Sequence, residues 1–472
     1  MTASAADITA ASESASADMV GDAGNVTVVC PAMKLNIGVF FDGTGNNTAN
    51  VREGGSGGSY ANARSNVSLL TQLYKNTDAY NVGNSCGTVS EKFAVLYVEG
   101  IGTRAGWSDW WPSNAVGAAT GMGLTGVEAR VLSACRKLGA MIDTLSDGVE
   151  PREIVVDVFG FSRGAAAARY FVNCFRQGFI EYNVGYILPI RASVPEGRNL
   201  RFRFIGIFDT VAAVGNGEND DNGDVNIHLS SAQADDIYHL TARHEYRTNF
   251  RLNENQPGGG DSREMLGAHS DVGGGYRDRG DRTRVAPSET HVFTDRASAE
   301  AAHAAHAAEA ARARTSEQQI WVQDGWIRPN EPTGGLDNAP SEIRVVTVQY
   351  RLRTFVRYTY TTGAILDRPW VQVGLSRIPL KIMYNRAISA GVPFLSFPTG
   401  TQYSPPAALK ALAGALCDGG AMPALDKQRE ILRNYGHVSA NLDSIGMAPG
   451  AGGAHQRHWQ RTRYPNKPGK AK

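Results

Sequence analysis

The sequence has little net charge, because 47 lysine and arginine residues are balanced by 46 aspartate and glutamate residues, leaving a formal charge of +1. Such a balance gives no bulk attraction to a polyanion, so we expect no nucleic-acid partner. No run of about 18 apolar residues occurs, so the sequence predicts no transmembrane helix. With 42% hydrophobic residues, the 472-residue chain can still bury a large core.

Residues 1–33 lack the basic and apolar segments of a secretory signal peptide. They are rich in serine and alanine, and we predict a disordered lead. If the protein leaves its cell, we expect a route that needs no cleaved signal.

Cysteine is also scarce, and its 5 residues form no CxxC pair and no cluster with histidine. The pattern predicts unpaired thiols, no metal site and no cofactor. His303 and His306 lie three residues apart on a predicted helix, but no acidic or thiol ligand has matching spacing.

Short β-rich apolar runs alternate with helical patterns, which predicts an α/β fold. The predicted helices are 127–145 and 165–175. The expected buried strands of a mostly parallel sheet, covered by helices on both faces, are 35–41, 93–98, 154–159, 202–208 and 343–348.

Residues 277–340 interrupt this alternation with a charged stretch, an alanine-rich helical stretch (297–314) and turns rich in glycine and proline. We interpret them as an inserted helical and irregular segment within a domain spanning 34–443. The insertion could be a lid, a partner-binding arm or merely a solvated surface helix. Residues 444–472 are predicted to be an irregular basic tail.

One pentapeptide has the form GxSxG in a context that suggests chemistry: Gly160-Phe161-Ser162-Arg163-Gly164. Ser162 follows a predicted buried strand and precedes a predicted helix, as a nucleophile elbow requires. A second match at 54–58 lies in a polar loop without that context. Small residues on both sides of Ser162 allow the strand and helix to approach closely, so we predict Ser162 as a nucleophile.

A serine nucleophile needs a histidine base and an orienting carboxylate, and in α/β-hydrolases the chain order is Ser, acid, His. Asp209 and Asp271 both follow probable strands. The glycines around Asp271 favour it as the acid, with Asp209 in a supporting position. His269 lies beside the acid, but the expected order favours the late His437.

The oxyanion that forms during acyl transfer needs backbone N–H donors. Arg163, directly after the nucleophile, is one candidate. The small-residue loop that begins with Asp42 and Gly43 after the first strand is the other. This loop lacks the lysine of a nucleotide-binding P-loop.

Six ordered segments over about 400 residues resemble the Tle1-like family of type VI secretion phospholipase effectors. They are VFFDGTGNN (39–47), VDVFGFSRGAAAAR (156–169), FIGIFDTVAAVG (204–215), LGAHSDVGGGY (266–276), LSRIPLKIMYNRAISAGV (375–392) and YGHVSAN (435–441). The resemblance implies an α/β-hydrolase fold and a triad carried by Ser162, Asp271 and His437. From the residues themselves, we place Asp209 and His269 in support of this triad.

The resemblance also implies hydrolysis of acyl esters in membrane phospholipids by a protein made in the bacterial cytoplasm and delivered to a neighbour's periplasm. The implied partners are the phospholipid membrane of the target cell, a cognate immunity protein and components of the secretion spike. Two other functions fit the residues: a soluble carboxylesterase for small esters, and a non-catalytic binding module associated with secretion.

Overall fold

The computed structural model describes residues 33–55, 58–76, 91–106, 126–146, 148, 150–181, 187–189, 200–212, 225–277, 280–331, 333–350, 353–442, 447–450 and 459–467. The predicted lead, residues 1–33, lies outside the described residues except for Met33.

A six-stranded sheet of order β2-β1-β3-β6-β7-β9 forms the centre of the molecule, and every neighbouring pair is parallel. Its strands are β1 (Lys34–Phe41), β2 (Glu91–Val98), β3 (Glu153–Phe161), β6 (Leu200–Phe208), β7 (Asp236–Ala242) and β9 (Asp261–Met265). The first four confirm predicted runs. The sequence analysis missed β7 and β9, whose polar residues obscure a buried run.

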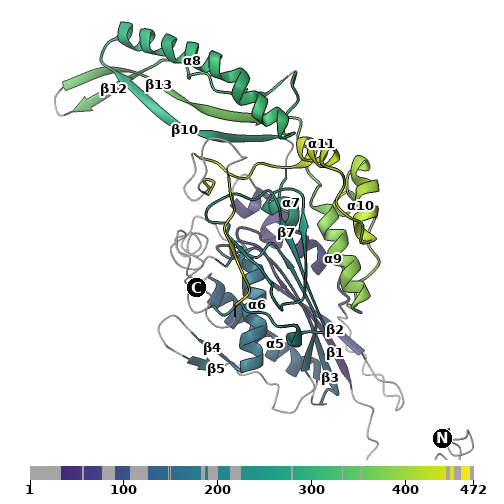
Figure 1. Ribbon diagram of the computed structural model, residues 1–472. Coiled ribbons are helices and arrows are strands. Elements are labelled where there is room, and N and C mark those ends of the chain that lie inside the picture. The colour runs from purple at the N-terminus through teal and green to yellow at the C-terminus, as the bar shows by residue number, and fades with distance from the viewer. Residues whose placement is uncertain are drawn as a thin grey trace, which may run out of the picture.

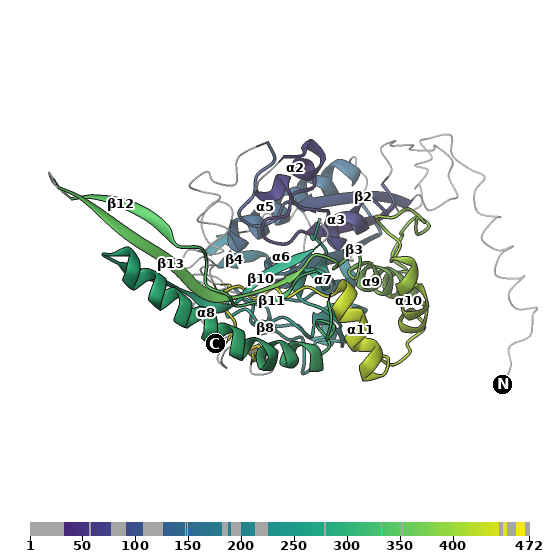
Figure 2. The same ribbon diagram turned by 90° about the horizontal axis from the view of Figure 1, so that it is seen from above.

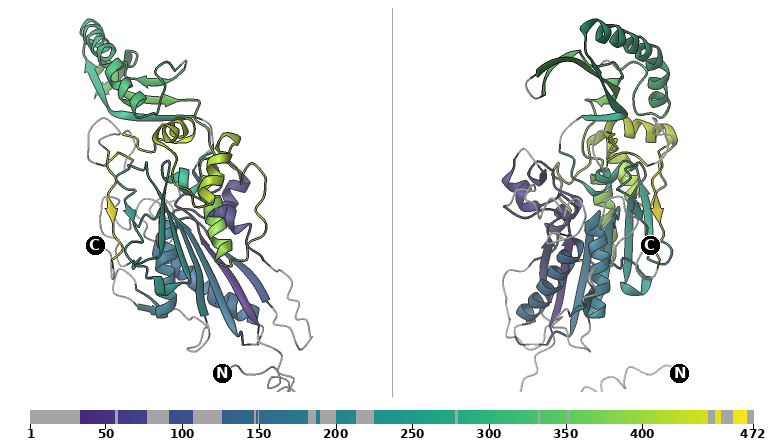
Figure 3. Two further views of the ribbon diagram at one scale, coloured as in Figure 1. Left: turned by 45° about the vertical axis from the view of Figure 1, so that its right-hand side comes forward. Right: turned by 90° about the vertical axis from the view of Figure 1, so that its left-hand side faces the viewer.

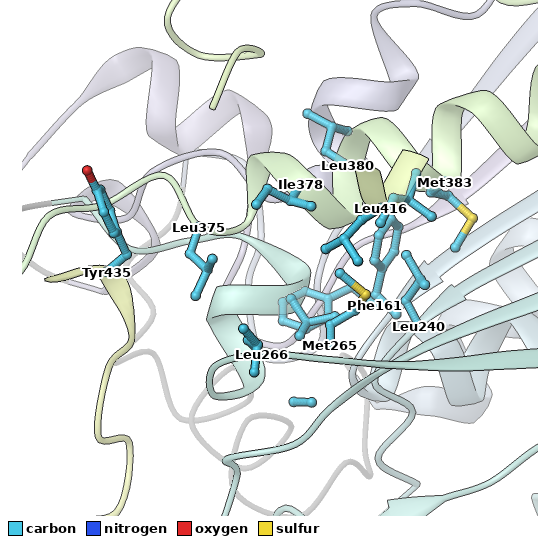
Figure 4. Packing of buried hydrophobic residues seen from close by; sticks show 14 of the residues in the cluster. Phe161, Leu240, Met265, Leu266, Leu375, Ile378, Leu380, Met383, Leu416 and Tyr435 are labelled. Atoms are coloured by element: carbon cyan, nitrogen blue, oxygen red, sulfur yellow. The ribbon is translucent and has the colours of Figure 1, made fainter. Parts of the chain in front are cut away.

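Helices cover both faces of this sheet (Figures 1 and 3). Helices α5 (Val127–Ser146) and α6 (Arg163–Gln177) pack against one face, and α3 (Asn66–Thr71) and α9 (Arg377–Ser389) pack against the other. Alternate strand residues divide between the two hydrophobic cores: Phe41 joins the α5–α6 core and Phe40 the α3–α9 core. Figure 4 shows the second core around Phe161 and Met383. This arrangement confirms the predicted α/β-hydrolase class.

The remaining helices and strands are shorter. They are α2 (Thr48–Glu53), β4 (Phe179–Glu181), β5 (Ile187–Pro189), β8 (Leu252–Asn253), α7 (His269–Gly273), α10 (Lys410–Cys417), α11 (Leu425–Tyr435) and β14 (Arg463–Tyr464). In the described ranges, no helix has the length and apolar character needed to cross a bilayer.

A separate antiparallel sheet with one long helix forms an arm that projects from the body (Figures 1 and 2). The arm comprises β10 (Asp281–Phe293), α8 (Arg296–Gln323), β11 (Gly335–Asp337), β12 (Arg344–Tyr350) and β13 (Arg353–Arg368). The predicted insertion 277–340 therefore stops short of the arm's last two strands. The expectation of a fifth buried strand at 343–348 was wrong. Residues 344–348 lie in β12, whose side chains are all exposed. The prediction failed because an apolar run alone does not identify the sheet to which it belongs.

The tail prediction for 444–472 was also wrong in part. β14 pairs in parallel with β8, and Trp459 and Asn466 are buried. The Asn466 amide donates to the carbonyls of Leu229 and Pro257, so this segment is an integral part of the body.

Candidate active site

Ser162 occupies a sharp turn between β3 and α6, with φ 59° and ψ −129°. Among the described residues, the only non-glycine residues with positive φ are Ser162 and Asp209. A serine pays a conformational cost there, and such strained residues cluster at functional sites. The conformation is the one that a nucleophile elbow imposes.

Two glycines make this turn possible, as the sequence predicted. A Cβ on Gly160 would lie 2.6 Å from Ala165 Cα, and one on Gly164 would lie 2.3 Å from the carbonyl oxygen of Asp42. The absence of both side chains therefore lets α6 start directly against β3 and against the loop after β1.

Asp209 follows β6 at the position beside Ser162. Phe161 and Phe208 are partners in the β3–β6 register, and the Ser162 N–H donates to the Phe208 carbonyl at 3.0 Å. The N–H of Val211 in turn donates to the Ser162 carbonyl at 3.3 Å. Ser162 and Asp209 are thus held next to each other at the carboxyl ends of adjacent strands, where α/β folds build their sites.

His269 begins α7 and faces Asp209. Its Nδ1 lies 2.5 Å from Asp209 Oδ2, and its ring centroid lies 4.6 Å from that of Phe161, the residue before Ser162. Its Nε2 is buried and makes no hydrogen bond to the described part of the chain. Burial lowers the pKa of His269, and the nearby Asp209 carboxylate offsets part of that effect. A neutral imidazole with a free Nε2 can accept a proton.

Arg461 holds the other side of Asp209. Its Nη1 donates to Asp209 Oδ1 at 2.8 Å and its Nη2 donates to Oδ2 at 2.9 Å. The Ala242 N–H adds a further bond to Oδ1 at 2.9 Å. Burial raises the pKa of Asp209, but the charge of Arg461 and the contact with His269 outweigh it and hold that pKa well below its ordinary value. No local motif marks Arg461, which lies in the segment predicted to be an irregular tail.

A second buried Asp–His pair involves the two residues that the sequence analysis preferred. Asp271 Oδ1 lies 2.8 Å from His437 Nδ1, and Asp271 Oδ2 accepts the His437 N–H at 2.9 Å. The His437 ring stacks on Tyr276 at a centroid distance of 3.8 Å, and its Nε2 also lacks a hydrogen-bond partner. The structure therefore brings these two residues together, as the sequence analysis expected.

The surroundings of the second pair differ from those of the first. Next to His437, the Val438 N–H donates to Asp281 Oδ2 at 3.0 Å, and Arg368 donates to the carbonyl of Gly436 at 2.9 Å. Asp281 is the first residue of β10 and Arg368 is the last residue of β13, the two long strands of the arm. The Asp271–His437 pair thus lies where the arm joins the body. No hydrogen bond joins Ser162 Oγ to either histidine among the described residues.

Glu245 connects the two pairs. Its Oε2 accepts the His269 N–H at 3.2 Å and the Ser439 hydroxyl at 2.9 Å. Burial raises the pKa of Glu245, but the Arg247 guanidinium outweighs it, so that the pKa falls to about 2. An ionised carboxylate therefore ties α7 to the segment that carries His437.

The loop after β1 packs against the elbow, but two of its N–H groups are already occupied. The Asp42 N–H donates to the Val98 carbonyl at 3.0 Å, and the Gly43 N–H donates to Asp42 Oδ1 at 2.8 Å. The predicted oxyanion donors Asp42 and Gly43 are therefore satisfied within the fold. Among the described contacts, no hydrogen bond involves the N–H of Thr44, the next residue.

Asp42 itself serves to fix this loop. Its Oδ1 accepts the Ser65 hydroxyl at 2.6 Å and its Oδ2 accepts the Tyr97 hydroxyl at 2.7 Å. Burial raises the pKa of Asp42, while these hydrogen bonds lower it, and the net shift is upward. Within the described ranges, no group of three or more His, Cys, Asp or Glu side chains is placed to hold a metal ion.

A parallel sheet covered on both faces, with a strained serine between strand and helix, defines an α/β-hydrolase. A profile of the family described as "T6SS, Phospholipase effector Tle1-like, catalytic domain" matches residues 36–183 and 190–302. The chain therefore belongs to the Tle1-like phospholipase effectors of the type VI secretion system. The match includes Ser162, Asp209 and His269, and it ends before most of the arm and before His437.

Two solved structures are similar to this chain. One, described as the structure of the Tle1 effector bound to the VgrG spike from the type 6 secretion system, has a TM-score of 0.65 and 23% identity, covering 92% of this chain and 94% of the other. An uncharacterised protein from Pseudomonas aeruginosa has a TM-score of 0.42 and 17% identity, covering 85% and 52%. The first supports the fold. No curated protein matches the sequence.

Proposed function

We propose that this protein is a serine esterase that hydrolyses acyl esters of membrane phospholipids with Ser162, His269 and Asp209. The observation that carries this proposal is the 2.5 Å contact between His269 Nδ1 and Asp209 Oδ2, formed at the strand end next to Ser162. The three residues keep the order Ser, Asp, His along the chain. All three also lie within the segments that match the family's catalytic domain.

Each residue then has a chemical role. Ser162 Oγ attacks the ester carbonyl while His269 Nε2 takes its proton, and the same imidazolium later protonates the leaving lysolipid alcohol. Asp209 accepts a hydrogen bond from His269 Nδ1–H, which fixes the tautomer and stabilises the imidazolium while the carboxylate stays ionised. A water activated by His269 then hydrolyses the acyl–Ser162 ester and releases the fatty acid. Arg461 keeps Asp209 ionised and oriented.

For the oxyanion, we propose the N–H of Arg163 and the N–H of Thr44. Arg163 directly follows the nucleophile, the position that supplies one donor in such elbows. Thr44 replaces the Asp42 and Gly43 donors that the sequence suggested, because those two N–H groups are bonded elsewhere.

The triad implied by the resemblance, Ser162 with Asp271 and His437, stays as the competing proposal. The Asp271–His437 contact of 2.8 Å supports it. Against it stand the hydrogen bonds that join Gly436 and Val438, the neighbours of His437, to the arm, and the position of His437 beyond the matched catalytic segments. Variants of the two histidines separate the proposals.

As a type VI effector, the protein is proposed to act on the phospholipids of a neighbouring cell, in the periplasm. We propose a secretion spike protein and a cognate immunity protein as its partners. The spike proposal is supported by the similar fold of an effector that was solved with the VgrG spike.

The test uses purified wild-type protein and Ser162→Ala on vesicles of phosphatidylethanolamine and phosphatidylglycerol, with products resolved by mass spectrometry. We expect wild-type protein to release fatty acid and lysolipid, and Ser162→Ala to lose at least about a thousandfold in rate. The lysolipid isomer gives the acyl position. Equal release by the folded variant would disprove the mechanism. Hydrolysis of short soluble esters only would favour a carboxylesterase.

A further inference from the structure

The arm ends in a two-stranded hairpin, β12 and β13, that extends away from the body (Figures 1 and 2). Among the described strands, β12 pairs with β13 alone, and all of its residues are exposed. Between 343 and 366 the sequence has four arginines and no acidic residue. The hairpin is therefore basic and partly apolar, although the whole chain has a net charge of only +1.

The strand register assigns these residues to faces. Tyr360 of β13 is 1% exposed and its hydroxyl lies 2.7 Å from His306 Nδ1, so its face is the one that α8 covers. Side chains alternate along a strand, so Tyr358 and Val356 share that face with Tyr360. Their partners in β12, Val345 and Thr347, lie on it as well.

On the opposite face, which we call the open face, no helix of the described part of the chain packs. Rows of paired residues place apolar and basic side chains together: Val346 with Arg357, Val348 with Phe355, and Tyr350 with Arg353. Arg344 and Val292 both pair with Thr359 and continue the same face. The open face comprises Val292, Arg344, Val346, Val348, Tyr350, Arg353, Phe355 and Arg357.

Most of the open face is exposed to solvent, although five of its eight side chains are apolar or aromatic; Phe355 and Arg357 are half-buried. Val292 is 57% exposed, Val348 45% and Val346 40%. Arg344, Arg353 and Arg357 form no ion pair with any residue in the described ranges, and the Arg357 guanidinium lies 5.4 Å from the Phe355 ring centroid. A contiguous apolar strip with unneutralised guanidinium groups is suited to an anionic, apolar partner.

We propose that the open face docks the enzyme on a bilayer that contains anionic phospholipid, a proposal that rests on the proposed function. The arginines bind lipid phosphates, while the valines, Tyr350 and Phe355 enter the interfacial region, as amphipathic surface anchors do. A protein partner would need a matching acidic and apolar patch. An anionic bilayer supplies both features and is the substrate of the proposed reaction.

The position of the arm agrees with this role. Helix α7 packs on Phe161 beside Ser162, since a Cβ on Gly273 would lie 1.9 Å from the Phe161 ring. The arm adjoins the end of the body where α7 lies (Figure 1). Docking by the hairpin would thus bring the end of the sheet that carries Ser162 toward the lipid.

The hairpin provides its own control, because exposed valines occur on both faces. Val346→Ser with Val348→Ser removes apolar contacts from the open face. Val345→Ser with Val356→Ser makes the same chemical change on the other face, at positions that are 63% and 44% exposed. A third variant, Arg344→Gln with Arg353→Gln and Arg357→Gln, removes the charge.

Binding is measured by vesicle co-sedimentation in a Ser162→Ala background, so that no lipid is hydrolysed. We expect the Ser162→Ala protein with an unchanged hairpin to bind phosphatidylethanolamine–phosphatidylglycerol vesicles and not phosphatidylcholine vesicles. Its affinity should fall as the salt concentration rises. The open-face double variant should lose about tenfold in affinity, the arginine variant on the order of a hundredfold, and the control double variant less than about twofold.

Equal binding by the open-face and control variants would overturn the proposal, as would a lack of binding to anionic vesicles. A third outcome would also overturn it: the wild-type protein forms a dimer, or a complex with the purified cognate spike protein, and the open-face variant loses that association but still binds vesicles. Hydrolysis of a soluble short-chain ester by the hairpin variants with Ser162 intact tests the catalytic proposal separately. If the hairpin variants hydrolyse the soluble ester and also bind vesicles as well as the unmodified hairpin does, only the docking proposal is disproved.

Discussion

Arg461 and Asp209 are joined by two hydrogen bonds, of 2.8 and 2.9 Å, across 252 residues of chain. The Arg461 side chain is 4% exposed and that of Asp209 is 0% exposed, so water replaces neither partner. The last segment of the chain thus supports a carboxylate at the centre of the candidate site.

We predict that Arg461→Gln lowers the free energy of unfolding by about 3–5 kcal/mol, because it leaves a buried carboxylate without its cation. Asp209 has a lowered pKa in the folded state, so its contribution to stability is present above its unfolded pKa and is lost as the pH falls. Without Arg461 the folded pKa of Asp209 rises toward or above its unfolded value, so this loss at low pH should become smaller or disappear. Chemical denaturation from pH 2.5 to 8, compared between wild type and Arg461→Gln, measures the difference.

Arg461→Lys is the matched variant, since it keeps the charge but cannot bond to both carboxylate oxygens. It should recover most of the stability and only part of the turnover number, kcat. Equal kcat for Arg461→Lys and wild type would show that the pair of hydrogen bonds from Arg461 is not needed to position Asp209.

The two buried histidines should respond differently to substitution. We expect His269→Asn to lower kcat on a soluble ester by at least about a thousandfold, because Ser162 loses its base. His437→Asn should lower kcat by less than about tenfold and mainly reduce thermal stability, because the His437 ring bonds to buried Asp271 and stacks on Tyr276. Reversed results would assign the triad to Asp271 and His437.

The pH dependence of kcat/KM should report His269. Burial lowers its pKa below the ordinary value of about 6.5, with partial compensation by Asp209. The base is active when neutral, so activity should persist below pH 6.5 and decline at a lower pH. A soluble ester avoids effects of pH on vesicles. An acid limb centred above pH 6.5 would contradict this reading.

The elbow should not tolerate a methyl group at Gly164. Gly164→Ala places a Cβ about 2.3 Å from the Asp42 carbonyl oxygen, and we expect a loss of about 1–3 kcal/mol in stability together with reduced activity. Gly414→Ala in α10 is the control. Nothing lies within 4 Å of its new Cβ, so it should be neutral or stabilise by up to about 1 kcal/mol. Thermal unfolding and ester hydrolysis of both variants check this.

The sequence by itself determined the local features of this protein. Four core strands, the helices α5 and α6 and the elbow at Ser162 were readable, because apolar periodicity and flanking glycines act over a few residues. The sequence also identified four residues that the fold places in two buried pairs: Asp209, Asp271, His269 and His437.

Only the tertiary structure decided how those residues combine. Asp209 stands beside Ser162 because β6 pairs with β3, and register cannot be read from isolated runs. His269 meets Asp209, His437 meets Asp271 at the base of the arm, and Arg461 reaches Asp209 from a segment predicted to be irregular. The apolar run at 343–348 likewise gave no sign that it belongs to the arm, because strand pairing cannot be read from an isolated run. Contacts between distant segments depend on how the whole chain packs, and no local pattern encodes that packing.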